Sequence, residues 1–180
     1  MTSGSTFPRR LTKIDDLTRP DHHYLSDTDE CYFLGEYTAR EGYGYSATNQ
    51  LIFNFKKSPK ERGKPSWYYK GVAITEVAVA FRAAITSPKW LDNATLVPTP
   101  PSKAKNDPMY DDRMVRMLRA IRHAPPLDTR ELVIQTQSTA AAHETDARPS
   151  PDEIEAVYRI DAKLLAPPPK VIAVFDDLLT

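Results

Sequence analysis

The sequence has little cysteine: Cys31 is the single one among 180 residues. One cysteine can form neither an internal disulfide nor a cysteine-based zinc cluster. The sequence also lacks an apolar run long enough to cross a membrane as a helix, and Met1–Arg10 lacks the apolar core of a signal peptide. These absences exclude a disulfide scaffold and predict a cytoplasmic protein with no membrane partner.

An excess of charge of one sign is missing as well. The 24 lysines and arginines balance 24 aspartates and glutamates, so the formal net charge is zero. This balance gives no strong nucleic-acid signal and no acidic disordered tail. Glycine is sparse, and no G-x-x-x-x-G-K-[ST] loop occurs, which excludes a P-loop nucleotide site. What remains is a chain long enough for one domain with a hydrophobic core.

The chain divides into two regions by pattern. Residues 1–30 are polar and weakly patterned, and aromatic and aliphatic residues recur near strand spacing from Cys31 to Tyr45. We expect residues 1–49 to form an irregular or β extension that covers the domain. Residues 50–180 are expected to form an α/β domain. Within it, aromatic and aliphatic residues near strand spacing predict a strand at Leu51–Phe55. A broad apolar surface over Gly71–Ile85, ended by Pro88, predicts a helix.

Strands and helices alternate after that helix. The predicted elements, beginning with a strand, are Thr95–Val97, 107–122, Leu132–Ile134, a helix that begins at the Ser150 capping box, and Val171–Phe175. We expect the last strand to be covered on both faces because it is apolar without a break. The arginines of the second helix, from Arg113 to Arg122, are expected on a solvated flank, and contact with a phosphate is the alternative. The alternation predicts βαβ units and a parallel, Rossmann-like sheet.

Two adjacent carboxylates, Asp176 and Asp177, follow the last strand. Open α/β sheets bind ligands at the carboxyl ends of their strands, so the pair is a candidate binding site. The residues alone leave open that the two aspartates cap the next turn or face solvent. A Walker B strand also ends in acids, but it needs the P-loop that is missing here.

The run from Val171 to Thr180 resembles the phosphoribosyl pyrophosphate (PRPP) signature of type I phosphoribosyltransferases. That signature has four apolar residues, two acids, two apolar residues and a threonine- and glycine-rich loop. The resemblance implies that Asp176 and Asp177 bind the ribose hydroxyls and that Thr180 begins the loop whose amides hold the 5′-phosphate. It also implies Mg²⁺, held largely by ligand oxygens, which Asp176 or Asp177 reaches directly or through water.

Because the sequence ends at Thr180, within this signature, we expect a fragment whose phosphoribosyltransferase-like core is incomplete at its C-terminus. The 180-residue chain itself is then expected to be inactive.

The run Thr95–Lys103 is similar to the first core strand and pyrophosphate loop of the same family, in its ComF-like branch. This likeness implies that Ser102 and Lys103 face the pyrophosphate. The residues alone leave open a proline-rich surface loop with a solvated lysine. The chain departs from the branch at Cys31, because ComF-like proteins often begin with a zinc module of several cysteines.

The stretch Gln135–Pro149 takes the place of the flexible loop that closes over the substrate in this family. His143 and Arg148 are candidate contacts of such a lid, and solvation of a plain loop is the alternative for each.

The implied activity, in a complete form, is transfer of a phosphoribosyl group to an unidentified acceptor with release of pyrophosphate, as in nucleotide metabolism. The alternative is a non-catalytic module that senses PRPP or a nucleotide-like small molecule. Whether the chain is an enzyme, and whether it forms a homodimer, stay open.

Overall fold

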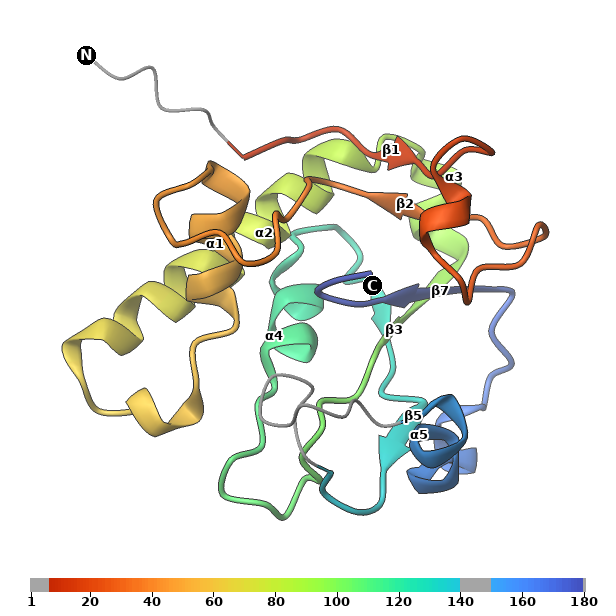
Figure 1. Ribbon diagram of the computed structural model, residues 1–180. Coiled ribbons are helices and arrows are strands. Elements are labelled where there is room, and N and C mark those ends of the chain that lie inside the picture. Colours follow the sequence, from red (N-terminus) through yellow and green to blue (C-terminus); the bar gives the residue numbers. More distant parts are fainter. Residues whose placement is uncertain (1–6, 140–149, 180) are drawn as a thin grey trace.

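A three-stranded parallel sheet forms the centre of the computed structural model, which describes residues 7–139 and 150–179 (Figure 1). The strand order is β4 (Asp128–Thr129), β3 (Ala94–Pro98) and β7 (Val171–Phe175). β3 pairs with β7 along its whole length, from Ala94 opposite Val171 to Pro98 opposite Phe175. The expected α/β class with a parallel sheet is thereby confirmed.

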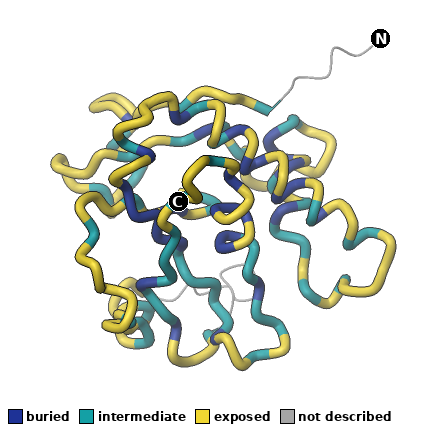
Figure 2. The backbone as a smooth tube through the Cα atoms, turned by 180° about the vertical axis from the view of Figure 1, so that it is seen from behind, coloured by how far each residue is buried: buried dark blue, intermediate teal, exposed yellow. Residues whose placement is uncertain are grey.

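Helices cover one face of this sheet. The α-helices are α1 (Ala47–Phe55), α2 (Tyr68–Ala84), α3 (Pro88–Asn93), α4 (Arg113–Ala120) and α5 (Pro151–Val157). α2 packs against both α1 and α4, and the core lies between these helices and the strands β3 and β7. Phe81 of α2 meets Phe175 edge to face, with ring centroids 5.3 Å apart. Buried backbone accordingly follows the inner helices and β3, while exposed residues form the outer loops (Figure 2).

The expectation that the last strand is covered on both faces is wrong. Phe175 and the partly buried Ala173 pack on the core, but Ile172 and Val174 point to the opposite face and are 55% and 66% exposed. β7 is one of the two edge strands of the described sheet, and the described core packs on only one of its faces. Its continuous apolar run therefore reflects strand propensity as well as burial.

The strand predicted at Leu51–Phe55 is also wrong, because this segment is the second half of α1. The side chain of Ser46 caps the helix by accepting a hydrogen bond from the backbone N–H of Asn49 at 3.0 Å. Leu51 and Phe55 are four residues apart, so they share one helical face, and both are buried. The cap and this spacing outweigh the β-propensity of the aromatic residues.

The helix predicted at 107–122 forms only as α4, which begins at Arg113. Asp107 instead accepts a hydrogen bond from the backbone N–H of Met109 in a turn. The apolar side chains at helical spacing over this segment are all buried: Met114, Met117, Leu118 and Ile121.

A small antiparallel ribbon stands outside the parallel sheet. β5 (Val133–Gln135), expected as a sheet strand, pairs antiparallel with β6 (Tyr158–Ile160). The Ser150 capping box is present and begins α5, but this helix ends at Val157 because the chain turns into β6. The third strand of the parallel sheet is the two-residue β4, which the sequence pattern did not indicate.

The described part of the N-terminal region is largely irregular. Two short strands, β1 (Thr12–Lys13) and β2 (Tyr32–Phe33), pair antiparallel, and α1 runs across the expected boundary at residues 49 and 50. Four short 3₁₀ turns complete the described structure: Arg19–Asp21, Pro59–Glu61, Pro65–Trp67 and Ala162–Leu164. In residues 7–139 and 150–179, no helix has the length and apolar character needed to cross a membrane.

Candidate functional site

The carboxyl ends of β3 and β7 are joined through Thr99. Its backbone N–H donates to the Phe175 carbonyl at 2.9 Å, and its hydroxyl lies 3.1 Å from the same oxygen. The hydroxyl also donates to Oδ1 of Asp176 at 2.9 Å. Thr99, the first residue after β3, is therefore hydrogen-bonded to Asp176, the first residue after β7. Such a contact is expected where neighbouring parallel strands end at one edge of a sheet.

Asp176 presents its carboxyl group at this edge, and the residue is exposed. Its Oδ1 accepts a second hydrogen bond from the backbone N–H of Asp177 at 2.7 Å. Protein packed behind the carboxyl, and then the negative charge of Asp177, raise the pKa of Asp176 above its ordinary value. A donor or cation supplied from outside would therefore stabilise the ionised form.

Asp177, in contrast, is fully engaged by two cations. Lys56, at the end of α1, places Nζ 3.2 Å from Oδ1, and Arg113, at the start of α4, places Nε 2.8 Å from Oδ2. Nη2 of Arg113 bonds the same oxygen. Burial by itself would raise the pKa of Asp177, but the guanidinium and the ammonium outweigh it and hold the pKa below its ordinary value.

The ion pairs continue into the interior. Arg113 also places Nη1 2.8 Å from Oδ2 of Asp111, and Lys70 places Nζ 2.8 Å from that same oxygen. Lys70 is 1% exposed and donates further to the carbonyls of Phe55 and Lys57. Burial lowers the pKa of Lys70 to about 8, although Asp111 offsets part of this effect.

We call the connected groups the charge chain. Its members, in order, are Lys70, Asp111, Arg113, Asp177 and Lys56. Of these five, only Asp177 was predicted from the sequence as a site residue. The solvated flank expected for Arg113 is wrong because its side chain is largely buried, whereas the alternative of phosphate contact stays a prediction. One feature of the sequence could have indicated the buried ion pairs. Lys70 lies one helical turn before the buried Ala73 and Ile74 of α2, so it shares their face, and a buried lysine needs a charged partner.

The predicted pyrophosphate loop makes its contacts with the segment after β5. The carbonyl of Ser102 accepts from the side-chain amide of Gln135 at 2.6 Å and from the backbone N–H of Thr139 at 2.8 Å. Nζ of Lys103 donates to the Thr139 carbonyl at 2.8 Å. The segment that sequence analysis took as the start of a lid therefore lies against this loop.

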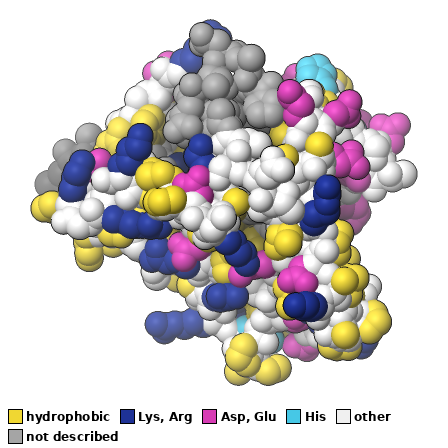
Figure 3. Space-filling model, turned by 90° about the horizontal axis from the view of Figure 1, so that it is seen from below, with side chains coloured by type: hydrophobic (Ala, Val, Ile, Leu, Met, Phe, Trp, Pro, Cys, Tyr) yellow, Lys and Arg dark blue, Asp and Glu magenta, His cyan; other side chains and the backbone are white. Residues whose placement is uncertain are grey.

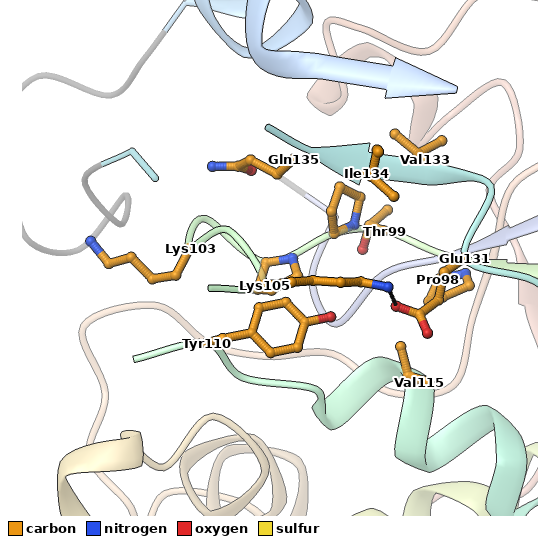
Figure 4. A pocket seen from close by; sticks show the side chains of 12 residues that line it. Pro98, Thr99, Lys103, Lys105, Tyr110, Val115, Glu131, Val133, Ile134 and Gln135 are labelled. Carbon is orange, nitrogen blue, oxygen red and sulfur yellow. Dashed lines mark ion pairs between the residues drawn. The ribbon is translucent and has the colours of Figure 1, made fainter. Parts of the chain in front are cut away.

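A pocket opens between the loop after β3 and the chain from β4 to β5 (Figure 4). Its empty volume, open solvent included, is about 300 Å³. Lys105 reaches across it to Glu131, with Nζ 2.6 Å from Oε2, and Tyr110 lies beside this ion pair (Figure 4). Burial and then the charge of Glu131 raise the pKa of Tyr110 to about 12. Thr99 belongs both to this pocket and to the junction with Asp176.

Three of the predicted site residues, Thr180, His143 and Arg148, lie outside the described residues, so their roles stay predictions. Within the part of the chain that the structure describes, no three His, Cys, Asp or Glu residues gather as a metal site. Comparison with known proteins found no protein-family model, no curated protein and no solved structure that matches the chain.

Proposed function

We propose that the chain binds PRPP, or a related phosphoribosyl ligand, together with Mg²⁺ at the carboxyl ends of β3 and β7. The observation that supports this most is the hydrogen bond between Thr99 and Asp176. It joins the beginning of the predicted pyrophosphate loop to the predicted ribose-binding acids, which lie far apart in the sequence. A sugar-phosphate that spans both would lie at the usual ligand position of an open α/β sheet.

Asp176, Ser102 and Lys103 each have a role in this proposal. Asp176 is exposed and accepts hydrogen bonds from the ribose hydroxyls. These donors favour the ionised form of its carboxyl group, whose pKa is raised in the free protein. Ser102 and Lys103 face the pyrophosphate, the lysine as a cation. Because the described residues hold no dedicated metal cluster, magnesium would be carried mainly by ligand oxygens, with Asp176 as its carboxylate contact.

In a catalytic form, an acceptor attacks the anomeric carbon of the ribose while the bond to pyrophosphate breaks. The protein supplies no nucleophile to this reaction; it positions the ligand and balances its charge. The second candidate is a non-catalytic module that binds the same ligand.

Titration calorimetry with PRPP and Mg²⁺ tests the proposal. Asp176→Asn should weaken binding at least about tenfold, because a charged acceptor contributes roughly 1.5–3 kcal/mol to such hydrogen bonds. Asp92→Asn is the matched control, since Asp92 is an exposed carboxylate on α3, and it should leave the affinity unchanged. Pyrophosphate release in the same samples separates an enzyme from a sensor. Absence of PRPP binding by the unaltered protein would contradict both.

A further inference from the structure

The carboxylate of Asp177 lies between a guanidinium and an ammonium that come from two different helices. Arg113 at the start of α4 offers Nε and Nη2 to one carboxylate oxygen, and Lys56 after α1 contacts the other. Such a planar fork together with a point charge is also the donor set that binds phosphate groups. Asp177 thus occupies a position whose chemistry suits an oxyanion.

This position is bounded by ion pairs on its inner side and is partly exposed on its outer side. Asp111 and Lys70 fix Arg113 from within, and Lys70 is 1% exposed. On the outer side, the Lys56 side chain is 34% exposed, whereas Asp177 is 7% exposed. An anion from solvent can therefore reach the ammonium of Lys56 first, before the guanidinium of Arg113. On the lower face of the molecule, several Lys and Arg side chains lie on the side where α1 and α2 lie in Figure 1, with Asp and Glu side chains among them (Figure 3).

We propose that Lys56 and Arg113 form a binding site for a phosphate or diphosphate group, and that Asp177 fills this site until such a group displaces it. The charge chain has three cations and two carboxylates, a net charge of +1. When Asp177 leaves, the remaining groups sum to +2, which the ligand anion then balances. Arg113 keeps its partner Asp111 throughout, so the exchange leaves no buried guanidinium unpaired.

The exchange deepens the proposed function and rests on it only for the ribosyl part of the ligand. A displaced Asp177 joins Asp176 at the edge of the sheet, where both carboxylates accept hydroxyl hydrogens of a ribose. A ligand that combines a diol with a phosphate is then bound more tightly than pyrophosphate alone. The anion site itself is tested without any ribose.

The test measures the affinity for inorganic pyrophosphate, without Mg²⁺, by titration calorimetry. Asp177→Asn removes the competing negative charge, so pyrophosphate should bind about tenfold more tightly, a gain of about 1.4 kcal/mol. PRPP should gain less in the same variant, because its ribose loses one carboxylate partner. Asp92→Asn should change neither affinity, since Asp92 lies on α3 away from the charge chain. Unchanged or weaker pyrophosphate binding by Asp177→Asn overturns the proposal.

A second variant keeps the proposal testable if Asp177→Asn fails to fold. Lys56→Met in the otherwise unaltered protein should weaken pyrophosphate binding about tenfold. Lys60→Met should not, because Lys60 is an exposed lysine elsewhere in the segment between α1 and α2. Equal affinities of these two variants would overturn the anion site. If pyrophosphate follows the expected pattern and PRPP does not bind, the anion site stands and the phosphoribosyl function fails. If PRPP binds, and Asp176→Asn weakens this binding while Lys56→Met has no effect, the phosphoribosyl function stands and the anion site fails.

Discussion

The hydroxyl of Thr99 donates a hydrogen bond of 2.9 Å to Asp176 and so connects the residues that follow two neighbouring parallel strands. Thr99 and Asp176 are 77 positions apart in the sequence. Their contact follows from the register of β3 and β7, which brings Pro98 opposite Phe175. The geometry of the candidate site thus depends on this pairing more than on any single side chain.

Replacement of Thr99 by valine should lower the free energy of unfolding by about 1 kcal/mol. Valine has a similar shape but lacks the hydroxyl, so the hydroxyl contacts with Asp176 and with the Phe175 carbonyl are lost, while the backbone N–H still donates to that carbonyl. Urea unfolding at neutral pH measures the change. Thr75→Val, which removes an exposed hydroxyl bonded only within α2, should cost less than about 0.5 kcal/mol. Equal losses in the two variants would show that the strand-end bonds contribute little.

Lys70 should make stability rise with pH above neutrality. Its pKa is about 8 in the folded protein, mainly through burial, against an ordinary value of 10.5. Between these two values the unfolded chain binds more protons than the folded one, so the free energy of unfolding increases with pH. The increase approaches about 1.4 kcal/mol per pH unit for a single group.

The measurement is urea unfolding of the unaltered protein and of Lys70→Met at several values between about pH 8 and pH 10. The difference in stability between them should grow with pH, because methionine does not titrate. Lys60→Met serves as the control, since Lys60 is exposed, and its difference from the unaltered protein should stay constant. A constant difference for Lys70→Met would contradict the lowered pKa of Lys70.

Two neighbouring residues of β7 should differ sharply in their effect on stability. Phe175 is buried against Phe81, so Phe175→Ala should cost about 3–5 kcal/mol through lost burial and the cavity left behind. Val174 points to the other face and is 66% exposed, so Val174→Ala should cost about 1 kcal/mol or less. Thermal or urea unfolding of the two variants checks this. A large loss in Val174→Ala would mean that this face is covered in solution.

Two segments have local sequence patterns that fit more than one structure. Leu51 and Phe55 fit either a strand face or a helical face, and the Ser46 cap decided for the helix. Asp107 and Pro108 have the pattern of a helix start, yet the helix begins at Arg113. Arg62 donates to the carbonyls of Pro108 and Tyr110, and these bonds hold the segment before α4 in a non-helical form.

The candidate site was predicted in part. The acids after β7 and the loop after β3 were predicted because each follows an apolar run directly in the sequence, one as a pair of aspartates and the other as a proline-rich stretch. The charge chain was largely missed because Lys56 follows α1, Lys70 lies in α2 and Arg113 begins α4, so that these residues meet only in the fold. Charge pairing across such distances leaves no periodic trace in a single sequence.

The sequence by itself determined the α/β class, the two main strands β3 and β7, and the position of Asp176 and Asp177 at a strand end, because apolar runs and breakers act locally. Only the tertiary structure decided that Asp177 is held by Lys56 and Arg113 while Asp176 stays accessible. The physical reason is that ion pairing depends on distance in space, and helix packing sets that distance.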